Sequence, residues 1–335
     1  GSSRSLCSSY SIAMRMSAAA IILAAFSALP AAAQPNPADW DAVLQEAKGQ
    51  TVYWHAWGGD PRINDFIAWV GEQALSRHGV TVTQVKLAST ADAVARVVSE
   101  QQAGQDQGGA VDLIWINGEN FAAMKGDGLL YGPFAEDLPN WPLVDIDGKP
   151  ATRMDFTEPT LGMESPWAMA QLVFEYDSAR LPAPPLGAGP LLDWVQANPG
   201  RFTYPQPPDY LGTTFLKQVL YGVIDTPELL LQPVDPATYD QVTAPLWAWL
   251  DEITPALWRQ GQAYPANEPA LGQLLADGEI DIAFAFNPGR ASAAIAAGEL
   301  SDTVRTTVWA GGTIGNASFV AIPYNAAHAA GAMVV

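Results

Sequence analysis

At 335 residues and 49% hydrophobic content, the chain is long enough to bury two hydrophobic cores and too apolar to be intrinsically disordered. Its formal net charge of −19 repels phosphate backbones and anionic lipid, so we expect neither nucleic acid nor a membrane surface as a partner. The same charge favours solubility, and it also attracts cationic solutes.

The N-terminal segment has the three-part layout of a secretory signal peptide. Residues 14–16 are short and basic, residues 18–29 form an apolar run, and residues 31–33 supply an alanine cleavage motif. A transmembrane anchor is the alternative, but the apolar run is shorter than the roughly 20 residues that a membrane-spanning helix needs. We therefore expect export to the periplasm, with residues 1–33 (upstream sequence and signal peptide) outside the fold.

The only cysteine, Cys7, lies within this N-terminal segment. The exported part of the chain therefore contains no disulfide, which a large domain does not need for stability. No apolar run precedes Cys7, so the sequence indicates a free periplasmic protein rather than a lipid-anchored one.

Residues 39–124 alternate between helical and strand patterns. Gly79 is expected to end one helix, and Ser89 or Thr90 is expected to cap the next. The alternation predicts an α/β lobe with a mainly parallel sheet. The predicted helices cover residues 39–48, 63–78, 91–102 and 117–124, and the predicted strands cover residues 50–57, 80–87 and 111–116.

Residues 126–164 are rich in glycine, proline and aspartate, which is typical of loops and short hairpins. Within them, residues 145–148 resemble the start of a calcium-binding loop. The later ligands and the closing glutamate of such a loop are missing, so we expect a plain turn there.

A second α/β block follows this loop region. Pro245 and Pro255 are expected to interrupt its longest helical pattern. Residues 326–335 begin an alanine-rich helix without a cap, so we expect the sequence to be a fragment that lacks further C-terminal elements. The predicted strands cover residues 168–176, 201–204, 280–286, 303–309 and 318–322, and the predicted helices cover residues 191–197, 213–223, 239–260, 270–276 and 288–297.

A family resemblance is carried by three stretches behind the leader: TVYWHAWGG (residues 51–59), VDLIWINGENF (111–121) and GGTIGNASFVAIPYNAAHAAGAMVV (311–335). Together they resemble family 1 extracellular solute-binding proteins of ABC importers, and within that family the YnjB-like branch. The resemblance implies a ligand-capturing protein that is not an enzyme.

The resemblance also implies an architecture, the type II fold of periplasmic binding proteins. Two α/β lobes are joined by crossing hinge strands, and hinge motion closes the cleft between the lobes on a ligand. The first lobe is expected at residues 34–165 and 314–335, and the second at residues 166–313. We expect a monomer that delivers a small-molecule solute to permease subunits, with no cofactor and no metal.

Candidate ligand-binding residues follow the predicted strands of the first lobe, because open α/β sheets bind ligands beyond the carboxyl ends of their strands. Trp57 is suited to stacking on a ring or a cation, although core packing explains it equally well. Gly59 lets a ligand approach the backbone, and Asp60 is suited to a positive group. Thr90 contributes a ligand contact only in addition to helix capping.

Three polar residues, Asn117, Glu119 and Asn120, follow a buried strand with almost no loop between. Ligand contact explains such a dense polar cluster better than helix capping alone.

The second lobe and the crossing strands supply the remaining candidates. Tyr210 is a candidate wall of the cleft, and Thr213 (or Thr214) is a natural helix cap beside N–H groups that suit an anionic or carbonyl oxygen. Asn287 either caps its helix or faces the cleft. Near the cleft floor, the crossing strands are expected to carry Trp167 and Asn316.

Gly311, Gly312 and Gly315 lie near the second crossing, where they suit either hinge rotation or ordinary turns. The acidic and aromatic candidates together favour a cationic or amine-bearing solute. These candidates are Trp57, Asp60, Glu119, Trp167 and Tyr210.

The alternative function is a secreted hydrolase of the glycosidase type, which needs two carboxylates; Glu119 and Glu164 are the first candidates. The sequence contains no nucleophile elbow, phosphate-binding Walker loop or dinucleotide-binding loop. His55, His78 and His328 are not spaced as metal ligands. A carbohydrate-binding module or adhesion protein is disfavoured by the α/β alternation, because such modules are usually β-sandwiches.

Overall fold

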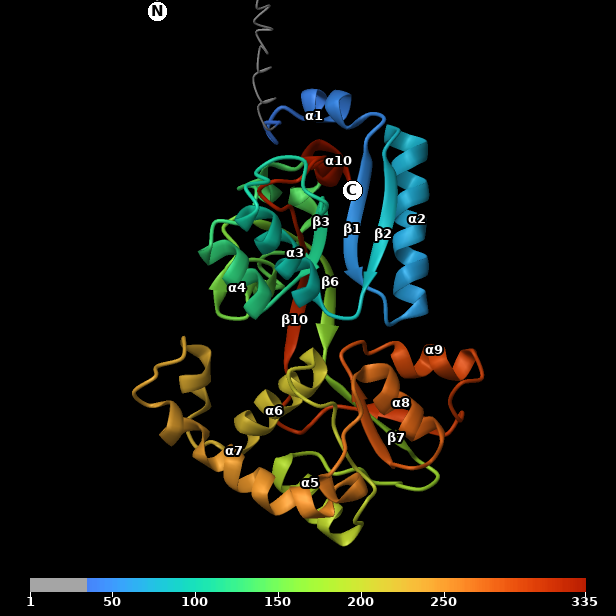
Figure 1. Ribbon diagram of the computed structural model, residues 1–335. Helices are drawn as coiled ribbons and strands as arrows, with labels where there is room; N and C mark the ends of the chain where they lie inside the picture. The colour runs from blue at the N-terminus through green and yellow to red at the C-terminus, as the bar shows by residue number, and fades with distance from the viewer. Residues whose placement is uncertain (1–34) are drawn as a thin grey trace, which may run out of the picture. The chain divides into compact units, whose positions relative to one another are not determined.

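The computed structural model describes residues 35–335 (Figure 1). The predicted signal peptide, its cleavage motif and Cys7 lie outside the described residues. The chain between 34 and 335 forms one compact unit. Within that unit, two sheets of different strand order each have their own hydrophobic core, and we call them the first and second lobes.

The first lobe contains a five-stranded sheet in the order β2–β1–β3–β10–β6. β1 pairs in parallel with β2 and β3, whereas β10 is antiparallel to both β3 and β6. Four strands therefore share one direction and β10 alone runs back, so the predicted mainly parallel sheet is mixed. The strands are β1 (Thr51–Trp57), β2 (Thr81–Leu87), β3 (Leu113–Ile116), β6 (Glu164–Gln171) and β10 (Gly315–Ala321).

The helices of the first lobe form where capping residues and apolar periodicity coincide. In the longest of them, Asp60 accepts hydrogen bonds from the first-turn amides, Pro61 occupies the first helical position, and Gly79 ends the helix at a φ of 68°. The helices are α1 (Trp40–Ala47), α2 (Pro61–His78), α3 (Thr90–Gln102), α4 (Glu119–Gly126) and α10 (Ala329–Val334).

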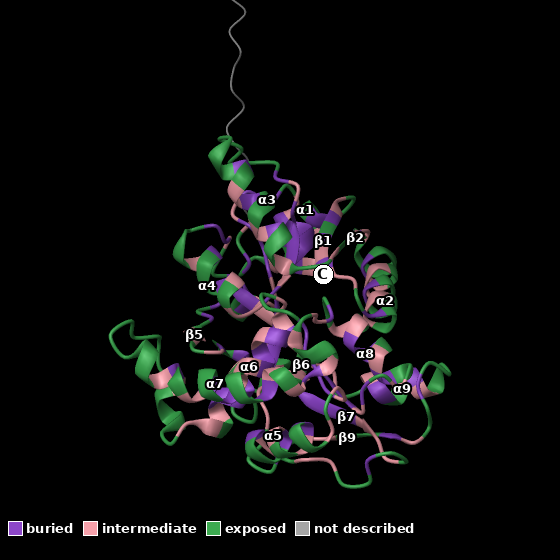
Figure 2. Cartoon of the chain, turned by 60° about the horizontal axis from the view of Figure 1, so that its bottom comes forward, coloured by how far each residue is buried: buried purple, intermediate pink, exposed green. Residues whose placement is uncertain are grey.

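The second lobe contains a three-stranded antiparallel sheet in the order β8–β7–β9. Figure 2 shows the buried residues concentrated in β7 and α6, with exposed residues along α5, α7 and α9. The strands are β7 (Val173–Asp177), β8 (Ile282–Ala285) and β9 (Val304–Thr307), and the helices are α5 (Ala188–Ala197), α6 (Tyr210–Val223), α7 (Tyr239–Ile253), α8 (Glu268–Ala276) and α9 (Arg290–Ala296).

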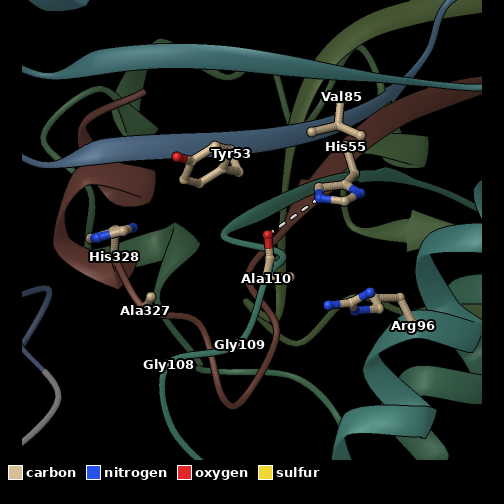
Figure 3. Close-up of a pocket in the computed structure, with 9 residues that line it drawn as sticks. All are labelled: Tyr53, His55, Val85, Arg96, Gly108, Gly109, Ala110, Ala327 and His328. Carbon is tan, nitrogen blue, oxygen red and sulfur yellow. Dashed lines mark hydrogen bonds between the residues drawn. The ribbon is translucent and has the colours of Figure 1, made fainter.

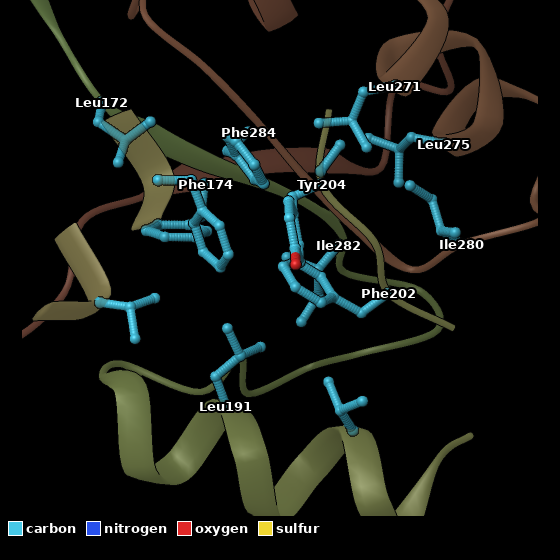
Figure 4. Packing of buried hydrophobic residues seen from close by; sticks show 14 of the residues in the cluster. Leu172, Phe174, Leu191, Phe202, Tyr204, Leu271, Leu275, Ile280, Ile282 and Phe284 are labelled. Carbon is cyan, nitrogen blue, oxygen red and sulfur yellow. The ribbon is translucent and has the colours of Figure 1, made fainter. Parts of the chain in front are cut away.

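Aromatic rings fill the core of the second lobe (Figure 4). Phe284 lies between two other rings, with its centroid 5.8 Å from that of Phe174 and 6.3 Å from that of Phe202. Leu191 of α5 packs beneath them. This separate core explains how the lobe holds its shape without disulfides, because buried aromatic area is a large stabilising contribution.

Two long strands connect the lobes. β6 and β10 pair side by side from Glu164↔Ala321 to Gln171↔Gly315, and Figure 1 shows them running together from the first lobe to the second. β6 is followed directly by β7, so the predicted single strand at residues 168–176 is in fact two strands in two sheets. The reason is that only Leu172 lies between them, and a one-residue break cannot be recognised in an apolar run.

Two other expectations for the second lobe are corrected. Residues 201–204 form no strand; the segment makes one bridge, Phe202↔Ile282, because it passes the edge of β8 only briefly. Pro245 does not interrupt α7, since Leu246 and Trp249 anchor the helix in the core and the Trp249 indole donates to the Ala188 carbonyl at 2.9 Å. The segment 145–148 is a turn, as predicted, with the Gly148 amide donating to Asp145 at 2.9 Å.

Candidate functional site

The carboxyl ends of β1, β2 and β3 meet at one edge of the first lobe's sheet, because the three strands are parallel. The Gly58 amide donates to the Leu87 carbonyl at 3.0 Å and holds the ends of β1 and β2 together. Seven of the twelve predicted site residues come from this edge: Trp57, Gly59, Asp60, Thr90, Asn117, Glu119 and Asn120.

At the end of β1, the Trp57 ring lies against the backbone of the following turn. A Cβ atom at Gly59 would lie 2.2 Å from the Trp57 ring, so only glycine allows this approach. The ring is half-buried and packs edge-on against Trp115, at 6.1 Å between centroids. Asp60 is buried and caps α2, accepting from the Arg62 amide at 2.8 Å. Its carboxylate therefore has a structural role whether or not it also meets a ligand.

Some of the residues where helices begin at this edge cap their helix, and others do not. Ser89 caps α3, and Thr90 donates to the Trp115 carbonyl at 3.2 Å. α4 has Gly118 at its cap position, at a φ of 62°, with no side-chain cap. Capping therefore does not account for the polar residues Asn117 and Glu119 on either side of Gly118.

The second lobe presents Tyr210 at the start of α6. The cap of α6 is Asp209, which accepts from the Gly212 amide at 3.0 Å; the prediction that Thr213 caps this helix is wrong, because the helix begins three residues earlier. Asn287 also does not cap; it accepts from the Gly289 amide at 2.9 Å in the turn before α9.

The Tyr210 hydroxyl is buried and has no hydrogen-bond partner among residues 35–335. Burial raises the pKa of this hydroxyl, and the carboxylates of Asp155 and Glu119 raise it further. Because Asp155 and Glu119 belong to the first lobe, the tyrosine faces acidic groups across the junction of the two lobes.

Both predicted residues on the crossing strands have unusual environments. Trp167 is the extra residue at the register break of β6 opposite Ser318 and Phe319, and such a bulge re-aims a side chain. Its ring lies 4.9 Å from that of Trp115. Asn316 is buried on β10, and its side-chain oxygen has no partner within the described part of the chain.

Sequence reasoning missed Asp155, which lies on a short hairpin of β4 (Met154–Asp155) and β5 (Glu158–Pro159). The hairpin falls within the glycine- and proline-rich region, where no periodicity marks a site. Its turn residue Phe156 has a φ of 54°, which is strained for a bulky side chain. The ammonium of Lys217 from α6 lies 5.7 Å from the Phe156 ring, so the hairpin meets the second lobe.

Glu164 pairs with Asp155 and not with Glu119, the partner expected for a hydrolase. Both Asp155 and Glu164 are 1% exposed. Burial raises the pKa of each, and the neighbouring Asp155 carboxylate raises that of Glu164 further. At least one of the two carboxyls therefore keeps its proton near neutral pH.

A second group of charges lies where α2 of the first lobe approaches α8 and α9. Arg290 donates to Glu175 at 2.9 Å. Glu268 accepts from the Phe286 amide at 3.3 Å. Burial raises the pKa of Glu268 to about 7; Arg290 and the Phe286 amide oppose the rise, whereas Glu175 and Asp60 of the first lobe add to it.

A pocket of about 480 Å³ lies elsewhere in the first lobe and contains none of the predicted site residues (Figure 3). Its polar side chains are largely engaged. His55 contacts the Ala110 carbonyl at 3.3 Å, Arg96 donates to Glu100 at 2.9 Å, and His328 lies 2.9 Å from Asp112. Its lining therefore offers a ligand little free hydrogen-bonding capacity.

Residues 35–335 lack the features of a metal centre and of a membrane-spanning helix. No three histidine, cysteine, aspartate or glutamate side chains in this part of the chain are grouped closely enough to hold a metal ion. None of its helices combines the length and apolar character needed to cross a membrane.

Comparison with known proteins gives one family match and a close relative. A family model described as bacterial extracellular solute-binding protein matches residues 69–334. Protein YnjB of Escherichia coli (strain K12) is 44% identical over 300 residues, which cover 90% of this chain and 77% of YnjB.

Solved structures with the same arrangement of lobes are more distant in sequence. PotD of Streptococcus pneumoniae, a spermidine/putrescine ABC transporter substrate-binding protein, has a TM-score of 0.57 at 15% identity, over 85% of this chain and 76% of PotD. Iron-bound HitA of Pseudomonas aeruginosa has a TM-score of 0.58 at 16% identity, over 85% and 79%. At these identities the likeness shows the fold, two α/β lobes joined by crossing strands.

Proposed function

Because the chain belongs to the family of bacterial extracellular solute-binding proteins, we propose that it captures a cationic, amine-bearing solute for an ABC importer. The solute binds between the lobes, which we place at residues 34–165 with 314–335 and at residues 166–313. The loaded protein, a periplasmic monomer exported by its signal peptide, then docks on permease subunits. It binds its solute without chemical conversion.

The observation that carries the cationic ligand is the Tyr210 hydroxyl of the second lobe, buried without a partner and facing the carboxylates of Asp155 and Glu119. Of the nearby cations, Lys125 is engaged by Glu158 at 2.7 Å and Lys217 lies over Phe156. The junction therefore has more negative groups than positive ones. A protonated amine would restore this balance, and it would supply donors to the carboxylates.

The remaining predicted residues support the same location. Asn117, Asn120 and Thr90 come from the strand-end edge of the first lobe, and Asn287 comes from the end of β8 in the second. Trp57 is half-buried, and its ring is of the kind that attracts cations, whereas the Trp167 ring packs against Trp54, Phe66 and Trp115. We assign the ligand site to these residues with Gly59, Asp60, Glu119, Tyr210, Thr213 and Asn316.

The relatives are compatible with an amine-bearing solute, but they do not single out this class of ligand. PotD is the substrate-binding protein of a spermidine/putrescine ABC transporter and HitA is iron-bound, so the shared fold serves chemically different cargo. The ligand class assigned to this chain therefore rests on its own side chains.

A thermal-shift screen against amines, vitamins, sugars, amino acids and oxyanions tests the proposal. Compounds that bind the folded form raise the melting temperature, and we expect amines to do so. Glu119→Gln should weaken binding about tenfold, whereas Glu72→Gln, an exposed glutamate on α2, should not. Shifts by sugars or anions alone would overturn the cationic ligand, and turnover of a bound compound would contradict the non-enzymatic role.

A further inference from the structure

Asp155 and Glu164 form a buried pair of carboxyl groups that lacks hydrogen-bond donors. Of their four oxygens, Asp155 Oδ1 accepts from the Gly118 amide at 2.9 Å. The other three, Asp155 Oδ2 and both Glu164 oxygens, are buried and receive no hydrogen bond from any residue in 35–335. A buried acceptor without a donor destabilises the folded protein, so a pair left in this state is costly.

One proton shared by the two carboxyls supplies only part of the hydrogen-bond donors that their oxygens lack. Because Glu164 lies beside Asp155, the two carboxyls can share one proton. That proton serves one donor oxygen and one acceptor oxygen, and it leaves the third oxygen without a partner. The pair therefore has more acceptors than the protein supplies donors.

The groups around the pair add little positive charge. Lys125 of α4 donates to Glu158 at 2.7 Å and to the Pro159 carbonyl at 2.6 Å, so its ammonium is already engaged. Glu119 of α4 and Glu158 of β5 add negative charge. From the second lobe, the neutral Tyr210 hydroxyl lies near Asp155, and the Lys217 ammonium lies over the ring of the adjacent Phe156, 5.7 Å from its centroid.

The missing partner is a compact donor with a positive charge. A metal ion does not fit, because no third acidic or histidine ligand is grouped with the pair in the described chain. A protonated amine has two or three N–H donors and matches the three open oxygens, whereas a quaternary ammonium has no N–H to donate.

We propose that Asp155 and Glu164 are the subsite for an N–H-bearing ammonium group of the solute, and that this group displaces the proton that the two carboxyls share. The inference rests on the proposed capture of a cationic solute and narrows its class to primary and secondary amines. The carboxyl O–H bond breaks and its proton passes to a water or buffer molecule as the ammonium group enters; no bond between heavier atoms forms or breaks.

Calorimetric titration with putrescine and spermidine, in two buffers of different ionisation enthalpy at pH 7, measures the protons released. We expect about one proton per amine bound, and affinity that rises up to tenfold per pH unit between pH 6 and 8. Glu164→Gln should abolish the release and weaken amine binding at least tenfold. Glu136→Gln, an exposed glutamate that pairs with Arg153, should change neither.

Choline, which has no N–H on its ammonium, distinguishes this subsite from general cation capture. Amine binding without proton release, or choline binding as tightly as the amines, would overturn the subsite while leaving capture of a cation intact. Binding of none of the three probes would overturn both proposals. Circular dichroism checks that Glu164→Gln is folded; if it is not, Asp155→Asn must show the same loss of proton release.

Discussion

Gly212 occupies the third position of α6, two residues after Tyr210, where the helix meets the preceding loop. A Cβ atom at this position would lie 2.0 Å from the Pro205 carbonyl oxygen, which is backbone and cannot rotate away. We therefore predict that Gly212→Ala displaces the start of α6 and lowers the free energy of unfolding by about 3 kcal/mol. Urea denaturation measures this change.

Gly189 provides the matched control, because it lies in the first turn of α5 and a Cβ atom there meets nothing within 4 Å. Gly189→Ala should leave stability unchanged or raise it by up to about 1 kcal/mol through helix propensity. Equal effects of the two substitutions would mean that the close approach at Gly212 does not position the helix.

The candidate site residues differ in whether they could be predicted from the sequence. Asn117 and Glu119 could be predicted as candidates because polar residues directly after an apolar strand have a position that parallel-sheet geometry dictates. Asp155 was missed, because its importance comes from burial beside Glu164 and Gly118, which only the tertiary fold brings together. Sequence spacing contains no trace of that contact.

At the scale of elements, the start of α6 is where the helix cap predicted from the sequence differs from the cap in the structure. Asp209 accepts from the Gly212 amide, whereas Thr213 lies inside the helix and caps nothing. Asp209→Ala should therefore lower stability by about 1 kcal/mol, the usual cost of losing a cap. Thr213→Ala should change it by less than about half of that, as measured by urea denaturation. The opposite ranking would restore Thr213 as the cap.

Helices and strands were recognised unevenly, for a physical reason. α2 was predictable because Asp60, Pro61 and Gly79 are strong local signals for where a helix begins and ends. The boundary between β6 and β7 was not, since one continuous apolar run serves two sheets. Local propensity identifies an element, but only tertiary pairing decides which sheet it joins.

At the scale of the whole molecule, the two α/β blocks and the paired crossing strands followed from the alternation of elements and the family resemblance. The direction of β10 was not readable, because it depends on the chain returning from the second lobe. Contacts between the lobes were also beyond the sequence. They include the approach of Asp60 to Glu268 and Arg290, which links the charge state of one lobe to the other.

Glu268 makes this link sensitive to pH. Burial raises its pKa from an ordinary value of 4.5 to about 7 in the folded protein, so the folded state holds a proton that the unfolded chain releases. Stability is then lost as pH rises from about 4.5 through about 7. Denaturation at pH 5 and pH 8 should show the stability of Glu268→Gln to be less pH-dependent than that of the wild type by about 2 kcal/mol.

The charge of ionised Glu268 should also change the distance between the lobes, because Asp60 of the first lobe is one of the groups that raise the pKa of Glu268. Ionised Glu268 repels Asp60, and separating the lobes relieves that repulsion. We therefore expect the radius of gyration of the unliganded protein, measured by small-angle X-ray scattering, to increase between pH 6 and pH 8. Glu268→Gln should abolish the increase, whereas substitution of an exposed glutamate shortly after α9, Glu299→Gln, should preserve it. An increase that persists in Glu268→Gln would assign the pH response to other groups. The Asp155–Glu164 pair would then be the first alternative, because burial raises the pKa values of both carboxyls as well.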